Sequence, residues 1–578
     1  MTDASATPPP PEAPTPVPGT LALARPEDRH TRAEWEAAAA AVLRKTGRLG
    51  DADPDDAVWE KLTRTTLDGI GITPLGLPVE TYAGLRPARS TGWDIRALVS
   101  GPDPKLVNEA ALADLDGGVT SLWVHLDEQQ SADLATVLDG VLLDLAPVVL
   151  DGAGDPRPLV QALLAVVQEN GITPHADTNL GADALGDEVV DVARTARELG
   201  VRGVVVDAVD AHDRGSSDVQ ELGYSLWAGV RALRALADAG FSVAQAAATL
   251  EFRYAATDEQ FPTIAKLRAA RRLWARVLEL SEASGVEQRQ HAVTSRPMLS
   301  KYDPYVNMLR GTVAAFAAGV GGADAITVLP FDSPLGAPEA FGRRIARNVN
   351  HLLIDESHVA AVADPAGGAY AVEKLTDDLA AAAWAEFQLL EKDGIDAFEE
   401  RVAATVARRE AEIARRKRPL TGLSEFPNLT ESLPERRPDP LNDAVRRYGA
   451  SFEALRDEPA ARPVFLATLG PVAQHTARAT FATNLLAAGG VAVEVAGATS
   501  GVDELAGRYR AADSPAVACL AGSDAAYAEW GAAAADALRA AGATYVIIAG
   551  KPVDYADDAC GVGVDALAFL ARVRERLS

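Results

Sequence analysis

The sequence contains little cysteine and no long apolar run. Only Cys519 and Cys560 occur among 578 residues, so no disulfide framework is indicated and a reducing compartment is expected. No stretch approaches the roughly 20 apolar residues that a membrane-spanning helix needs. The N-terminus also lacks the basic segment and apolar run of a secretory signal. These absences favour a cytoplasmic protein that is not inserted in a membrane.

Metal-binding motifs and an excess of basic residues are absent too. The sequence has eight scattered histidines and no HExxH, HxH or paired CxxC motif, so we predict no metal site. His351 and His358 are seven residues apart, a spacing compatible with one helical face, but two ordinary polar histidines are the simpler interpretation. Against 55 Lys and Arg stand 82 Asp and Glu, a net charge of −27. This charge argues against nucleic acid as a partner, because phosphates are bound by basic clusters.

The length predicts at least two domains, preceded by an N-terminal tail and arm. Residues 1–28 are rich in Pro, Ala and Thr, and we predict that this tail is disordered. Residues 29–90 are expected to form a helical and extended arm. Within it, residues 31–47 have helical spacing, with Thr31 as the N-cap and Gly47 at the end. This helix could pack on a partner protein or on its own domain.

Residues 91–418 alternate between short β-branched runs and long Ala- and Leu-rich segments. Such alternation is typical of parallel β/α units, and eight of them predict a (β/α)8 TIM barrel. Helices are expected at 222–236, 264–280 and 304–318, and one or two long helices at 375–417. The expected strands are 120–124, 147–150, 173–176, 203–206, 242–246, 292–294, 325–329 and 359–363.

The last third of the sequence predicts a linker and a second α/β domain. Residues 419–462 are rich in proline but contain apolar residues, which favours a linker lying across a surface. Alternation resumes in residues 463–578, and the pattern predicts a small flavodoxin-like domain. Its expected strands are 464–469, 491–495, 516–520 and 545–549.

One short motif matches a pattern that presents histidine to cobalt. The segment from Asp210 to Gly215 reads D-x-H-x-x-G with His212 at its centre. Imidazole is a good cobalt donor, a carboxylate can orient its second ring nitrogen, and glycine permits close approach. Because the segment directly follows the expected strand 203–206, we prefer to interpret it as a barrel loop that enters the next helix.

Five further segments form a recognisable set. They are FPTIAKLRAARRLW at 261–274, YDPYVNMLR at 302–310, RIARN at 344–348, DPAGGAY at 364–370 and LTGLSEFPN at 420–428. Together, in order and in spacing, they resemble the methylmalonyl-CoA mutase family, and the resemblance covers residues 31–578. It implies a TIM barrel that binds acyl-CoA through its centre, followed by a linker and a cobalamin-binding domain.

The residues expected at the substrate site differ from those of the active family members. In active chains a substrate-contacting tyrosine follows Trp-x-Ile-Arg-Gln; here Trp93-Asp-Ile-Arg96 is followed by Ala97 and Leu98. Leu98 therefore stands at the tyrosine position and cannot donate a hydrogen bond. Asp210 stands at the position of a substrate-facing histidine, and its carboxylate would repel an anionic substrate.

The cobalt-binding pattern of the family, Gly-x-Asp-x-His-x-x-Gly, is also altered. The resemblance places Val472 at the aspartate, Gln474 at the cobalt ligand and Ala477 at the glycine. A glutamine amide is a poor cobalt ligand beside imidazole. His475 lies one residue out of register, where a loop would leave it a residual role.

These differences make the sequence similar to the small, non-catalytic chain of heterodimeric methylmalonyl-CoA mutase. The resemblance implies that a large subunit holds adenosylcobalamin and the acyl-CoA and converts methylmalonyl-CoA to succinyl-CoA. Leu98, Asp210, Val472, Gln474 and Ala477 would then be vestigial positions, with no catalytic, cofactor or metal residue on this chain. Two alternatives stay open: an active acyl-CoA mutase of altered specificity, and a regulatory binding protein on a reused scaffold.

Overall fold

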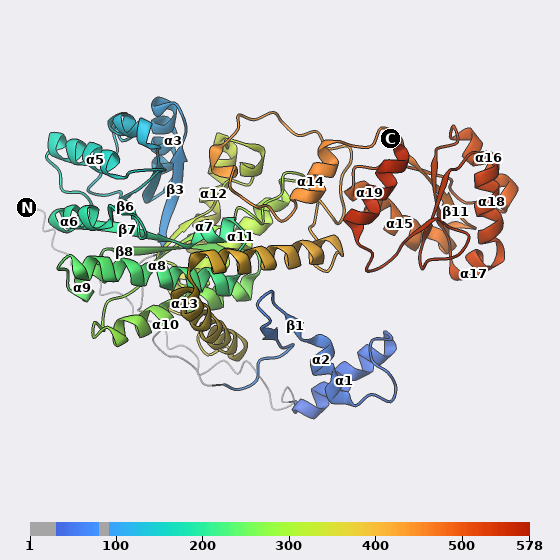
Figure 1. Ribbon diagram of the computed structural model, residues 1–578, viewed down its shortest axis with the longest axis horizontal. Helices are drawn as coiled ribbons and strands as arrows, with labels where there is room; N and C mark the ends of the chain where they lie inside the picture. The colour runs from blue at the N-terminus through green and yellow to red at the C-terminus, as the bar shows by residue number, and fades with distance from the viewer. Residues whose placement is uncertain (1–29, 80–91) are drawn as a thin grey trace, which may run out of the picture. The chain divides into compact units, whose positions relative to one another are not determined.

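A computed structural model describes residues 30–79 and 92–578 (Figure 1). The predicted disordered tail lies outside the described residues. The described chain separates into two compact units. The first comprises residues 30–65 and 71–75, and the second comprises residues 66–70, 76–79 and 92–578.

The first unit is a small helical arm. Helix α1 (Arg32–Lys45) begins at Thr31, whose side chain forms a reciprocal capping box with Glu34, as the sequence predicted for its N-cap. The 3-10 turn Asp55–Ala57, α2 (Val58–Leu62) and the short paired strands β1 (Arg64–Thr65) and β2 (Gly71–Ile72) follow. The core of this unit is small and consists of Ala40, Leu43, Leu49 and Val58.

The second unit begins with a closed barrel of eight parallel strands in the order β10-β3-β4-β5-β6-β7-β8-β9. This architecture confirms the predicted (β/α)8 barrel. The strands are β3 (Asp94–Ser100), β4 (Ser121–His125), β5 (Val148–Asp151), β6 (Asn179–Asp183), β7 (Arg202–Asp207), β8 (Leu250–Ala256), β9 (Arg289–Thr294) and β10 (Ala325–Thr327).

Amphipathic helices cover the outside of the barrel, and the three predicted helices overlap α8, α10 and α11. A break at Gly394, with φ of 82°, divides α13 in two. The main helices are α3 (Pro104–Asp116), α4 (Leu134–Val137), α5 (Arg157–Asn170), α6 (Val189–Leu199), α7 (Ala208–Asp213), α8 (Asp218–Asp238), α9 (Val243–Ala248), α10 (Gln260–Leu280), α11 (Val306–Gly321), α12 (Ala340–His351) and α13 (Tyr370–Ala414).

Three of the predicted barrel strands were wrong. Residues 173–176 precede β6, which begins only at Asn179. Residues 242–246 enter α9, because Ser242 caps that helix through a capping box with Gln245. Residues 359–363 contain a 3-10 turn. The strands missed in their place are β3, β6 and β8.

The linker connects the barrel to the second α/β domain, and buried apolar side chains hold parts of it in place. It contains a 3-10 turn at Pro440–Asn442 and α14 (Ala450–Asp457). Leu423 and Phe452 are fully buried and join the same core cluster as the first strand of the following domain. These two side chains attach the segment to the core of the C-terminal domain.

The C-terminal domain is a five-stranded parallel sheet in the order β12-β11-β13-β14-β15. The four predicted strands are confirmed, and β15 was missed. The α15–α19 helices pack on the two faces of the sheet (Figure 1). No helix in residues 30–79 and 92–578 is long and apolar enough to cross a membrane. The elements are β11 (Val464–Thr468), α15 (Val472–Ala488), β12 (Val493–Val495), α16 (Val502–Ala511), β13 (Val517–Ala521), α17 (Asp524–Ala526), α18 (Ala532–Ala540), β14 (Tyr545–Ala549), β15 (Asp558–Cys560) and α19 (Ala566–Leu577).

Candidate functional site

The interior of the barrel is crossed by a buried ion pair. Arg96 on β3 and Glu251 on β8 belong to strands that are not neighbours, yet their Nη1 and Oε1 atoms lie 2.6 Å apart. Arg96 also donates hydrogen bonds to Ser121 and Asp94. Both charged side chains are at most 1% exposed, so the pair lies inside the barrel and away from water.

A second layer of large side chains lies beside this ion pair. The guanidinium of Arg253 on β8 lies 4.1 Å from the ring centre of Trp123 on β4 and pairs with Asp151 and Asp207. The edge of the Trp123 ring also meets His291 on β9, with 5.5 Å between ring centres. These residues come from β4, β5, β7, β8 and β9. They therefore fill the barrel interior, where a ligand passing along the axis would have to lie.

These interior residues were missed at the sequence level, although a signal for them exists. Charged residues alternate with apolar ones in Asp94-Ile-Arg96 and again in Glu251-Phe-Arg253. In a strand, alternate residues share one face. The two segments therefore indicate charged side chains on one face of each strand, although they do not show which of these charges meet.

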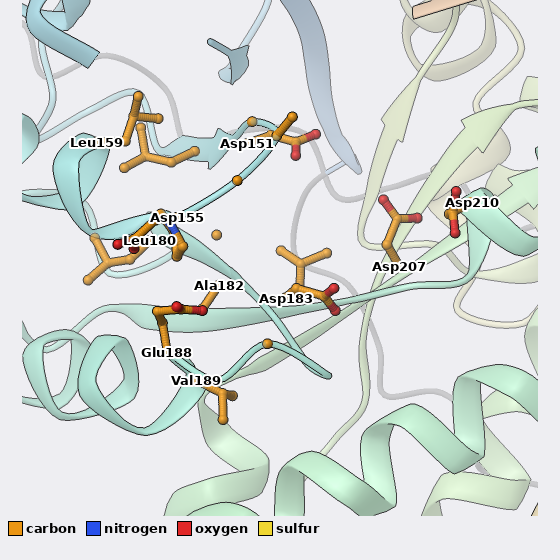
Figure 2. A pocket seen from close by; sticks show the side chains of 18 of the residues that line it. Asp151, Asp155, Leu159, Leu180, Ala182, Asp183, Glu188, Val189, Asp207 and Asp210 are labelled. Carbon is orange, nitrogen blue, oxygen red and sulfur yellow. The ribbon is translucent and has the colours of Figure 1, made fainter. Parts of the chain in front are cut away.

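Asp210 lies at the edge of an acidic cavity of about 400 Å³ at the carboxyl ends of β5, β6 and β7. Figure 2 shows Asp151, Asp183 and Asp207 around this cavity, with Asp210 beyond Asp207. Asp210 is exposed, and its carboxylate lies 3.2 Å from Arg214. The cavity also contains Tyr224.

The carboxylates of this cavity affect one another. Burial raises the pKa of Asp183, and the negative charges of Asp207 and Asp151 add to the shift. Although the Asp210 side chain is exposed at the edge of the cavity, the protein around it partly removes its carboxylate from water and so raises its pKa; Arg214 opposes the shift, while Asp207 and Asp183 add to it. A cavity with this excess of carboxylates repels an anionic acyl-CoA.

Leu98 lies elsewhere, so the structure does not bring the two predicted substrate positions into one cavity. Its side chain is half-buried on β3, next to Trp123 in the strand register. It lines a separate cavity with Arg343 and His125. Asp210 is absent from the lining of that cavity.

His212 is a buried structural residue within α7. Its Nε2 lies 2.7 Å from Oγ of Ser295, and its Nδ1 lies 3.5 Å from Oε2 of Glu221. All three side chains are over nine-tenths buried, so the Ser-His-Glu arrangement is closed to substrates and the imidazole is not presented to a metal. Gly215 serves packing: an added Cβ would lie 2.4 Å from Val406 of α13.

The altered cobalt motif lies at the start of α15. Val472 is the first residue of this helix and is 61% exposed, and Gln474 and Ala477 are exposed in its first two turns. Gln474 turns back over Gly470, where an added Cβ would lie 2.5 Å from its Oε1. An exposed amide beside a valine provides neither the donor nor the orienting carboxylate that a cobalt–imidazole bond requires.

A residual role of His475 in binding cobalt would have required a loop, and the structure has a helix there. His475 lies in the first turn of α15 and is 6% exposed. Its Nδ1 donates to the carbonyl of Gly470 over 3.2 Å. The histidine therefore ties the end of the β11 loop to the helix.

The two spaced histidines do not share a helical face. His351 ends α12 and contacts the carbonyl of Gly117 over 3.1 Å, whereas His358 lies in a left-handed turn outside the helix. Among the residues that the structure describes, no three His, Cys, Asp or Glu side chains gather in a way that could hold a metal ion.

The sequence profile of a known family, described as methylmalonyl-CoA mutase, matches residues 187–512, more than half of the chain. The chain belongs to the methylmalonyl-CoA mutase family. This membership confirms the resemblance that the sequence motifs indicated. The barrel is therefore a mutase barrel, and the mutases of this family are isomerases.

Curated members of the mutase family match almost the whole chain. A protein of Streptomyces virginiae named methylmalonyl-CoA mutase small subunit is 45% identical, over 96% of this chain and 98% of its own length. A probable methylmalonyl-CoA mutase small subunit of Mycobacterium tuberculosis H37Rv is 41% identical, over 90% and 92%. A small subunit of Propionibacterium freudenreichii subsp. shermanii is 36% identical, over 94% and 92%.

Proposed function

We propose that this chain is the small, non-catalytic subunit of a heterodimeric methylmalonyl-CoA mutase. The observation that carries the proposal is the filled barrel. Arg96, Glu251, Trp123 and Arg253 occupy the interior that a threaded acyl-CoA would need. Reopening it would leave buried charges without partners, which is costly.

The substrate and cofactor positions support the same proposal. Leu98 and Asp210 line different cavities, and the cavity of Asp210 carries the wrong charge for an acyl-CoA. Gln474 and Val472 do not fit a cobalt-binding motif. We therefore place adenosylcobalamin, which supplies a carbon-centred radical when bound, and the acyl-CoA on the large subunit.

In this proposal the chain contributes to the enzyme by assembling with the catalytic subunit. It retains a full barrel and a full α/β domain without using either for chemistry, so its contribution is to bind and stabilise the catalytic subunit in the cytoplasm. Permanent complexes of this kind bury on the order of 2,000 Å² or more. We also propose the domain boundaries that the sequence predicts. They give an arm that ends at residue 90, a barrel at 91–418, a linker at 419–462 and a degenerate cobalamin-binding-like domain at 463–578.

Co-expression with the large subunit of the same organism tests this function. We expect a 1:1 complex by light scattering, one cobalamin per heterodimer by its absorption spectrum, and no cobalamin on this chain alone. A tight cobalamin complex of the isolated chain with mutase activity would instead favour an active mutase of altered specificity. Failure to form a complex would favour a regulatory binding protein.

A further inference from the structure

A second cavity, of about 350 Å³, lies beyond the carboxyl ends of β3 and β4. We call it the β3 cavity. Its volume lies within the range of about 300–1,000 Å³ that is typical of small-molecule sites. One wall is helix α3, and residues 437–441 of the linker form another. Much of the lining is apolar and includes Leu98, Leu106, Val107, Ala110 and Leu441.

The carboxylates that line the β3 cavity already accept hydrogen bonds from backbone N–H groups. Asp103 caps α3 and accepts from the Lys105 N–H over 3.0 Å. Asp127 accepts from the N–H of Gln130, and Asp439 accepts from the N–H of Leu441, each over 3.1 Å. These three acids therefore hold local structure, and their hydrogen-bonding capacity toward a ligand is reduced.

The arginine side chains that line the β3 cavity have few hydrogen-bond and ion-pair partners. Within the described residues, the Arg437 side chain has no ion pair or hydrogen bond, and its Nη2 would lie 3.8 Å from a Cβ added to Gly101 in the cavity wall. Nε of Arg343 is buried without a hydrogen bond, and its nearest acidic atom, Oδ2 of Asp114, is 3.9 Å away. The cavity is also lined by His125, whose Nδ1 has no hydrogen bond and lies 3.6 Å from Oδ2 of Asp151.

We infer that the β3 cavity binds a small amphipathic carboxylate. The apolar wall between α3 and the linker takes the tail, and the guanidinium groups of Arg343 and Arg437 take the carboxylate. Arginine matches a carboxylate with paired N–H donors, which makes it the better anchor for a planar anion. This site is separate from the acidic cavity of Asp210 and does not depend on the proposed subunit role.

The bound carboxylate would join two parts of the chain. Arg343 belongs to α12 of the barrel, whereas Arg437 belongs to the linker that leads to the C-terminal domain. A ligand held by both arginines therefore fixes the linker against the barrel. Its chemical class is a monocarboxylate with a short apolar chain, because a second anionic group would meet Asp103, Asp127 or Asp439.

Calorimetric titration of the full chain with butanoate, hexanoate and octanoate tests the proposal. We expect saturable 1:1 binding that tightens with chain length, and no binding of octylamine, which has the same tail with a positive charge. Inorganic phosphate should bind at least tenfold more weakly than octanoate. Equal binding of phosphate or octylamine, or no binding of any of the three acids, would overturn the assignment.

Two substitutions locate the site without risk to the fold. Arg437→Gln changes an exposed side chain and should weaken octanoate binding at least tenfold. Leu106→Asp, at a wall residue that is 55% exposed, should do the same by repelling the carboxylate. The matched control is Arg344→Gln on the exposed side of α12, which should change the affinity less than twofold. Equal effects of Arg437→Gln and Arg344→Gln would contradict the site.

Discussion

Arg96 on β3 and Glu251 on β8 meet across the barrel interior, with 2.6 Å between Nη1 and Oε1. Burial acts to raise the pKa of Glu251, but the positive charges of Arg96 and Arg289 outweigh it, and the net pKa is lowered. Both groups are therefore charged inside the barrel. This ion pair blocks the axis of the mutase barrel. Its contribution to the stability of the barrel requires both residues.

Breaking that pair should destabilise the barrel strongly. Glu251→Ala removes the nearer of the two carboxylates that pair with the buried Arg96 and leaves Asp94 at 3.1 Å, and we expect a loss of about 3 kcal/mol in the free energy of unfolding. Urea unfolding followed by tryptophan fluorescence measures it. The double variant Arg96→Met with Glu251→Leu removes both charges and should recover much of the loss. If the double variant is less stable than Glu251→Ala, the pair contributes through packing and not through charge.

Asp68 should make stability depend on pH. Its carboxylate accepts a hydrogen bond from Ser217 at the start of α8. Burial raises its pKa from 3.8 to about 6, Ser217 opposes the shift and Asp218 adds to it. Between these values the folded state binds more protons than the unfolded state, so this contribution to stability is full below pH 3.8 and falls as pH rises to 6.

Asp68→Asn removes this titration and keeps an oxygen acceptor for Ser217. The variant should be more stable than the parent at pH 8, and the difference should shrink as pH falls below 6. Thermal unfolding between pH 4 and pH 8 measures both. Asp51→Asn, at an exposed aspartate, serves as the control. A constant difference across the whole pH range would show that Asp68 does not titrate in this window.

Loss of helix α1 should weaken the heterodimer. Within the described residues of the first unit the core has four buried apolar side chains, too few for an independent fold. The outer face of α1 leaves Val42 61% exposed beside Ala38 and Ala41. Deleting residues 1–50 should therefore raise the dissociation constant for the large subunit at least tenfold more than deleting residues 1–25. Equal affinities of the two truncated chains would exclude a role for the helix.

Asp210→Ala should leave mutase turnover of the assembled heterodimer nearly unchanged. Asp210 is exposed and pairs only with Arg214 of the same helix region among the described residues. Turnover per assembled complex, with the complex quantified by size exclusion, gives the comparison. Leu98→Ala should behave in the same way once normalised for folded complex, since in the proposed subunit role it contacts no reacting group. A hundredfold loss of turnover for Asp210→Ala would assign this chain to the chemistry.

The sequence predicted the barrel but misplaced several of its strands, for physical reasons. The strand β3 carries Asp94 and Arg96 on its inner face, so it lacks the apolar alternation by which strands are recognised. Residues 242–246 were taken for a strand although Ser242 and Gln245 have the spacing of a helical capping box. That signal was present in the sequence.

Other features could not be predicted from local sequence. The Arg96–Glu251 contact joins residues 155 positions apart and exists only because the sheet closes on itself. The β3 cavity likewise combines Leu98, Arg343 and Arg437 from three distant segments. The motif residues Leu98 and Asp210 were recognisable as positions, but their separation into different cavities could be seen only in the closed fold.

Helix α15 has an evolutionary consequence. Because the helix begins at Val472, position 474 lies within its first turn and not on a free loop. Gln474→His would therefore place an imidazole on a helical backbone, and the change of Val472 to Asp and Ala477 to Gly would not by itself unwind that turn. The path back to a cobalt site requires a backbone rearrangement, which no single reversion provides. In the subunit role that we propose, restoring the cobalt motif would therefore require a change in the backbone of the first turn of α15 as well as changes of side chain.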